Sequence, residues 1–126
     1  MSNAHVILFL ELSVKEGRED DVRALAHEMA ESSQANEAGT LDYEIFVSDD
    51  GRRVHAIERY ADAGAAMAHL ATFGERWMGR FFDALVPERT FVYGAPDDAV
   101  RGALAPLAPT YMRDLAGFSR HAALVS

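Results

Sequence analysis

The sequence predicts a single α+β domain followed by a short C-terminal extension. Four segments have the composition of strands, and two longer segments carry apolar residues at spacings of three and four. Between the two middle strands, Asp49-Asp50-Gly51-Arg52 supplies the residues of a tight turn. We place the domain at residues 5–94 and the extension at residues 95–126.

Composition and charge limit the classes of function. The chain is 49% hydrophobic and 25% charged, which is typical of a globular protein rather than a disordered one. Its formal net charge of -8 argues against nucleic acid or an anionic membrane as a partner. The absence of cysteine excludes disulfides, thiolate metal sites and a cysteine nucleophile. No apolar run suits a membrane span or a signal peptide, so we expect a cytoplasmic protein and give residues 1–4 no functional meaning.

The first element is a strand over 6–14 that is apolar on both faces. Ile7 and Phe9 alternate with a second apolar set on the opposite face, formed by Val6, Leu8, Leu10, Leu12 and Val14. A strand of this kind requires cover on both sides of its sheet.

A helix is predicted from Arg18 to about Glu37, with Gly39 as its stop signal. Acidic residues in its first turn suit the helix dipole. Strands over 41–47 and 54–60 then form a hairpin around the turn.

Asp62 is a plausible N-cap for a second helix. Its apolar stripe continues through Phe73, Trp77 and Phe81, with a possible break at Gly74. Pro87 interrupts the pattern, and residues 89–93 are predicted to form the fourth strand.

The order strand, helix, strand, strand, helix, strand is the split βαβ, ferredoxin-like arrangement. It predicts a four-stranded antiparallel sheet with two helices on one face. A second copy of the chain is the simplest cover for the other face, so we expect a homodimer. The alternative is that the C-terminal extension covers this face within one chain.

The extension is predicted to be helical. Asp97 or Asp98 can cap a short helix that runs to Leu104, and residues 109–115 have the pattern of another. We expect the extension to dock on the domain or on the partner subunit through the apolar side chains of Tyr111, Met112, Leu115 and Phe118.

Glu58 and His69 are the candidate acid/base residues. Glu58 lies on a predicted central strand, where burial would raise its pKa toward neutrality. His69 lies at the edge of the apolar stripe of the second helix and can reach a space between helix and sheet. The alternative is that both residues make only structural hydrogen bonds or ion pairs. The histidine spacings match no metal-binding motif, so we expect no metal, and the sequence contains no phosphate-binding loop.

Aromatic residues are numerous for a chain of this length. Most belong in the core, but some can line a pocket for a flat aromatic ligand. The candidates for binding are Tyr43, Tyr60, Phe73 and Trp77.

Three segments resemble the antibiotic biosynthesis monooxygenase family over residues 5–94. They are Gly39-Thr40-Leu41-Asp42-Tyr43, Glu58-Arg59-Tyr60 and Ala66-Met67-Ala68-His69. The resemblance implies a dimeric α+β barrel and oxidation of a small quinol- or anthrone-like aromatic by O2, without flavin or metal. It implies that Glu58 and His69 deprotonate the substrate and that Tyr43 and Tyr60 can hydrogen-bond it.

The sequence departs from the family pattern at Tyr60, where a tryptophan is frequent. The first strand lacks the asparagine of the haem-degrading branch, which argues against haem degradation. Two other functions remain open: an isomerase of a small oxo-compound that uses the same acid/base pair, and a ligand-binding dimer without turnover.

Overall fold

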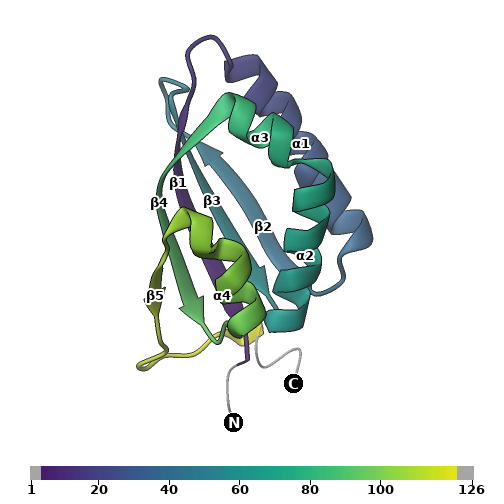
Figure 1. Ribbon diagram of the computed structural model, residues 1–126, viewed down its shortest axis with the longest axis vertical. Coiled ribbons are helices and arrows are strands. Elements are labelled where there is room, and N and C mark those ends of the chain that lie inside the picture. The colour runs from purple at the N-terminus through teal and green to yellow at the C-terminus, as the bar shows by residue number, and fades with distance from the viewer. Residues whose placement is uncertain (1–3, 122–126) are drawn as a thin grey trace.

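The computed structural model describes residues 4–121 as one sheet with helices against one of its faces (Figure 1). The elements are β1 (Val6–Val14), α1 (Glu19–Asn36), β2 (Thr40–Val47), β3 (Arg53–Tyr60), α2 (Ala63–Arg76), α3 (Met78–Ala84), β4 (Leu85–Gly94), α4 (Asp98–Leu104), the 3-10 turn η1 (Ala105–Leu107) and β5 (Thr110–Met112). The predicted α+β, ferredoxin-like fold is confirmed. Within residues 4–121, no helix has both the length and the apolar character needed to cross a membrane.

The sheet has five strands and is mixed, in the order β2-β3-β1-β4-β5. The four predicted strands pair antiparallel, but a sheet of only four strands is wrong, because β5 adds to β4 in parallel, with Val92 opposite Tyr111. The helix predicted over 109–115 is wrong for the same reason. Pairing with the edge of β4 satisfies backbone groups that a one-turn helix would leave open. It also places Tyr111 beneath the guanidinium group of Arg101, 4.1 Å from the ring centroid.

β4 begins at Leu85, earlier than the predicted start at residue 89. The strand tolerates Pro87 because its register with β1 shifts there: Glu11 pairs with Arg89 and Leu12 with Pro87, which leaves Glu88 as an extra residue. Proline lacks an N–H donor and is accepted at such bulges.

The predicted helices lie close to their expected positions. The first turn of α1 carries the predicted acids, and α1 ends at Asn36. Asp62 caps α2 by accepting a hydrogen bond from the backbone N–H of Ala65 at 2.8 Å. The break between α2 and α3 falls at Trp77, where φ is -117°, rather than at Gly74.

The core lies between the helices and one face of the sheet. The side chains of β1 that face the helices are buried, and they pack with residues of α1 and α3 such as Leu25 and Phe81. Since β1 is the central strand, its helix-facing side chains set the floor of this core.

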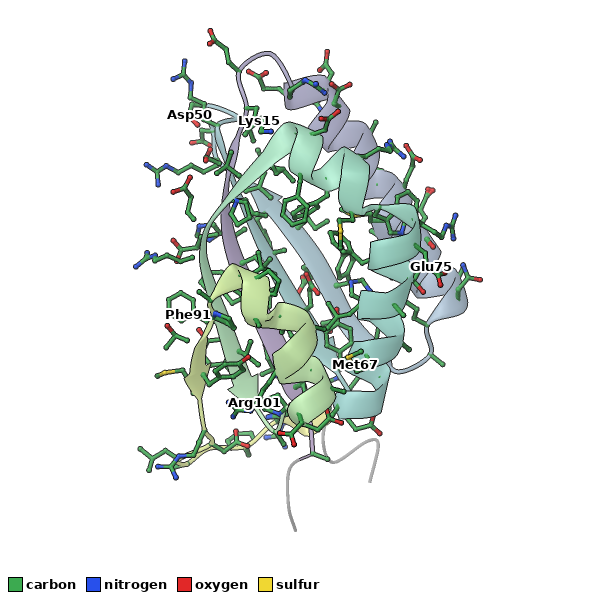
Figure 2. The ribbon with its side chains drawn as sticks, viewed as in Figure 1. Lys15, Asp50, Met67, Glu75, Phe91 and Arg101 are labelled. Atoms are coloured by element: carbon green, nitrogen blue, oxygen red, sulfur yellow. The ribbon has the colours of Figure 1, made fainter. Side chains whose placement is uncertain are left out.

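The opposite sheet face has no cover within residues 4–121. Phe9 stacks on Phe91, and Phe91 stacks on Tyr93, with ring centroids 6.0 and 6.3 Å apart. Figure 2 shows Phe91 pointing away from the helices. The extension does not bury its large apolar side chains on this face, because Leu115 and Phe118 are 98% and 82% exposed.

Candidate active site

Glu58 lies at the centre of the sheet, on the face covered by the helices. It sits in β3 between two neighbours, opposite Leu8 of β1 and Tyr43 of β2. The alternation of β3 turns it inward with Val54, Ala56 and Tyr60, all of which are buried. A carboxyl group is thus held in the core on a rigid strand, with only 6% of the residue exposed.

The surroundings of Glu58 favour its protonated form. Burial raises the pKa of Glu58, while the nearby His69 and a hydrogen bond from Tyr60 act in the opposite direction. The Tyr60 hydroxyl donates to Glu58 Oε1 at 2.5 Å. Burial and the proximity of Glu58 raise the pKa of Tyr60 well above its ordinary value. Tyr60 therefore keeps its proton and acts as a hydrogen-bond donor. Of these two residues, Glu58 is the one that can exchange a proton.

His69 places one ring nitrogen near each of two carboxyl groups. Its Nδ1 lies 2.8 Å from Glu37 Oε1, and its Nε2 lies 3.6 Å from Glu58 Oε1. The second distance is longer than a hydrogen bond, but a small movement or a bound group can close it. His69 is 5% exposed and sits on the inner face of α2. The structure therefore places Glu58 and His69 side by side.

Glu37 was not predicted as part of the site. The sequence pattern identifies it only as the end of the first helix. It contacts His69 because the loop after α1 returns beside α2. The approach depends on Gly39, where a Cβ atom would lie 2.5 Å from Ala65 Cβ in the first turn of α2. A side chain at position 39 would push α2 away and separate His69 from Glu37.

Tyr43 completes the polar side of the site. Its ring centroid lies 5.2 Å from that of His69, and its hydroxyl donates to Met29 Sδ at 3.8 Å. Burial, with the charges of Glu58 and Glu37, raises the pKa of Tyr43. Tyr43 is therefore a neutral donor that faces the same space as the acid/base pair.

A cavity of about 60 Å³ opens beside these residues between the sheet and the helices. Its lining is apolar except where the functional side chains reach it. The predicted residues that line it are Tyr43, Glu58, His69 and Phe73. Leu104 and Leu107 line it from the extension, where α4 lies in front of the sheet in Figure 1.

Tyr60 and Trp77 do not line this cavity. Tyr60 acts on it through Glu58. Trp77 sits at the junction of α2 and α3, and the guanidinium groups of Arg76 and Arg80 lie 4.9 and 5.8 Å from the centroid of its ring. Its position fits a structural role at the helix break, and its contact with a ligand stays a prediction.

The raised pKa of Glu58 predicts how stability depends on pH. The unfolded chain ionises Glu58 near its usual value of 4.5, whereas the folded chain keeps the proton to higher pH. Above pH 4.5, wild type should therefore lose stability relative to Glu58→Gln by about 1.4 kcal/mol per pH unit, until the folded carboxyl ionises. Urea unfolding from pH 4 to 8 measures this difference, and parallel curves for the two proteins would contradict it.

The antibiotic biosynthesis monooxygenase family model matches residues 5–74. This span is more than half of the chain. The chain belongs to the antibiotic biosynthesis monooxygenase family. The resemblance read from the sequence is thereby confirmed. A search of curated proteins found no match.

Several solved structures share the fold of this family member. MupZ from Pseudomonas fluorescens is 25% identical, with a TM-score of 0.80, and the match covers 94% of this chain and 96% of that chain. A putative antibiotic biosynthesis monooxygenase from Bacteroides thetaiotaomicron is 22% identical, with a TM-score of 0.61 over 67% and 83% of the two chains. SnoaB from Streptomyces nogalater, a cofactor-independent oxygenase, is 16% identical, with a TM-score of 0.62 over 75% and 95%.

The match to MupZ covers 94% of this chain, whereas residues 95–126 make up about a quarter of it. The match therefore includes part of the extension. The matches to SnoaB and the Bacteroides protein cover smaller shares of this chain, 75% and 67%.

Proposed function

We propose that this protein is a cofactor-independent monooxygenase that oxidises a small quinol- or anthrone-like aromatic with O2. The observation that carries the proposal is the buried Glu58, protonated more readily than a surface carboxyl, beside His69 in an apolar cavity. Family membership and the fold shared with a cofactor-independent oxygenase support it.

The proposed reaction begins with removal of a proton from the substrate. A carboxylate whose pKa is raised by burial is a stronger base than one in water, so Glu58 can accept a proton from an acidic phenol or anthrone. Tyr60 holds the accepting oxygen in place, and Tyr43 can donate a hydrogen bond to the substrate oxygen. His69 is the second group that can exchange that proton.

The substrate anion supplies the electrons for O2. It passes an electron to O2, and the two radicals combine to form a carbon–oxygen bond. Loss of water from the resulting hydroperoxide turns the reacting CH2 of an anthrone into a carbonyl group. One oxygen atom enters the product and the other leaves as water, so no external reductant is needed. The protein contributes binding, proton removal and exclusion of water.

The cavity must enlarge to hold an aromatic ring. Its volume of about 60 Å³ is well below the roughly 300–1,000 Å³ of ordinary ligand pockets. We propose that residues 95–126 act as an extension whose described part covers the site, and that substrate enters when Leu104 and Leu107 move aside.

If Leu104 and Leu107 cover the cavity, Leu107→Ala should speed the binding and release of a ligand. Removing a half-buried side chain from the lining should speed both association and dissociation of an anthraquinone by about tenfold. Stopped-flow quenching of Trp77, the single tryptophan, can follow binding. Leu115→Ala is the matched control, because Leu115 lies in the same extension and is 98% exposed. Unchanged rates in Leu107→Ala would show that this residue is not part of the entrance.

The experiment that tests the function is oxygen uptake by the purified, metal-stripped protein with a panel of quinols and anthrones. Substrate-dependent uptake, with a product that contains one atom from labelled O2, is expected. Uptake that appears only after adding a metal or a flavin would contradict the proposal.

The small cavity favours a second candidate, the isomerisation of a small oxo-compound by the same pair of acid/base groups. This reaction moves a proton between two carbon atoms and needs no O2. Incorporation of deuterium from D2O into a small ketone under argon would support it. A protein that binds its ligand but shows neither reaction would be the non-catalytic ligand-binding dimer.

We also propose that the uncovered sheet face joins two copies of the chain, as in a dimeric α+β barrel. On this face Phe9 lies opposite Ile57 of β3 and Phe91 of β4, and Ile7 lies opposite Tyr93. Apolar side chains therefore meet across β1, β3 and β4 in one part of the face. The large apolar side chains exposed on this face are Phe46, Ile57, Val86 and Met112.

A further inference from the structure

Glu37 lies behind His69, on the side away from the cavity. It does not line the cavity, yet its carboxylate is the closest acceptor to His69 Nδ1, at 2.8 Å. All three side chains are nearly buried, with Glu37, His69 and Glu58 exposed by 9%, 6% and 8%. Glu37, His69 and Glu58 therefore form a buried row of polar groups that ends at the cavity.

The position of Glu37 is fixed by its neighbours. Its backbone N–H donates to Ser33 O at 3.0 Å, and its carbonyl oxygen accepts from the backbone N–H of Thr40 at 3.1 Å. The Thr40 hydroxyl also donates to Glu37 Oε1 at 2.9 Å. A carboxylate held on both its backbone and its side chain is a defined acceptor, not a mobile surface group.

This acceptor determines which ring nitrogen of His69 carries the proton. An ionised carboxylate only accepts hydrogen bonds, so Nδ1 must donate to Glu37. In the neutral ring, Nε2 is then left without a proton and faces Glu58 Oε1 at 3.6 Å. The rings of Tyr43 and Tyr60, at 5.2 and 5.3 Å, limit rotation of the imidazole.

We propose that Glu37 is a positioning residue that fixes the tautomer of His69, so that the unprotonated Nε2 can take the proton that Glu58 receives from the substrate. The O–H bond of Glu58 breaks and an N–H bond forms at His69 Nε2, which leaves an imidazolium whose Nδ1–H still donates to Glu37. One proton moves, and the carboxylate of Glu37 lies beside the positive charge that forms on the ring. The proposal rests on the proposed function, because it takes Glu58 as the group that receives the substrate proton and must be reset.

The first test is the tautomer of His69, measured by 15N NMR of the imidazole nitrogens and assigned by the loss of signal in His69→Gln. In wild type, the neutral ring should carry its proton on Nδ1. In Glu37→Ala, most of the population should move to Nε2. Glu31→Ala is the matched control, since Glu31 is an exposed residue of α1. Retention of the Nδ1 proton in Glu37→Ala would overturn the positioning role.

The second test is the same 15N measurement in the conservative variant Glu37→Gln. This variant keeps an oxygen that can accept from Nδ1, and the Thr40 hydroxyl can still donate to that oxygen. The neutral ring should therefore keep its proton on Nδ1 in Glu37→Gln, in contrast to Glu37→Ala. A shift to Nε2 in Glu37→Gln as large as that in Glu37→Ala would overturn the role assigned to the acceptor oxygen.

Neither measurement needs a substrate or O2. A protein that fails to consume oxygen can still show the Nδ1 tautomer and its loss in Glu37→Ala. Failure of the oxygenase proposal and failure of this one are therefore distinguishable.

Discussion

Glu58→Gln is expected to lower turnover by about 10²–10⁴-fold, the range that loss of a general acid or base commonly produces. The amide oxygen of Gln can still accept the hydrogen bond from Tyr60, so the variant should fold and keep the shape of the cavity. It cannot accept the substrate proton, which is the step assigned to Glu58. Initial rates of oxygen uptake, measured with the best substrate of the panel, test this expectation.

Glu75→Gln is the matched control for that variant. Glu75 lies on α2, the same helix as His69, but its side chain is exposed and points away from the sheet (Figure 2). Its turnover should equal that of wild type. If Glu58→Gln keeps the wild-type rate, Glu58 has a structural role and the proposed base must be sought elsewhere.

Local sequence signals were sufficient for much of the fold. The alternation of β1 and the three-and-four spacing of α1 report burial directly, since each residue position on a strand or helix determines the face it occupies. The cap at Asp62 depends on one side chain and its own backbone neighbours. These elements could therefore be read from short windows of sequence.

The elements that were missed depend on contacts between distant residues. β5 is only three residues long, and it exists because β4 offers a free edge beside it. Three residues carry too little periodicity to separate a strand from a helical turn. The break at Trp77 likewise follows from how α2 and α3 pack, and the glycine three residues earlier gave a misleading local signal.

The candidate site shows the same division. Glu58 could be found because a carboxylate on the inner face of a central strand is unusual and invites a chemical explanation. Glu37 could not, since a glutamate at the end of a helix has the composition of any solvated position. Its role arises from a contact across 32 positions of the sequence, which no local pattern encodes.

Phe91→Arg is expected to convert a homodimer into a monomer. Phe91 lies on β4 within the uncovered sheet face, stacked between Phe9 and Tyr93. In the proposed dimer, the substitution would bury an unpaired charge at the centre of the interface, which costs several kcal/mol. The dimer dissociation constant should therefore rise by about 100-fold or more. Light scattering after size-exclusion chromatography separates the two states, because the subunit mass is 13.8 kDa.

Met78→Arg is the control for this experiment, because Met78 is an equally apolar, 46% exposed side chain on α3, away from the sheet face. It should remain dimeric. A wild-type protein that is monomeric at about 100 μM, or a Phe91→Arg protein that stays dimeric, would exclude this face as the subunit interface. The site lies on the opposite side of the sheet, so the Phe91→Arg monomer should keep the Nδ1 tautomer of His69. Loss of turnover in such a monomer would then reflect a need for the partner subunit rather than damage to the Glu37, His69 and Glu58 arrangement.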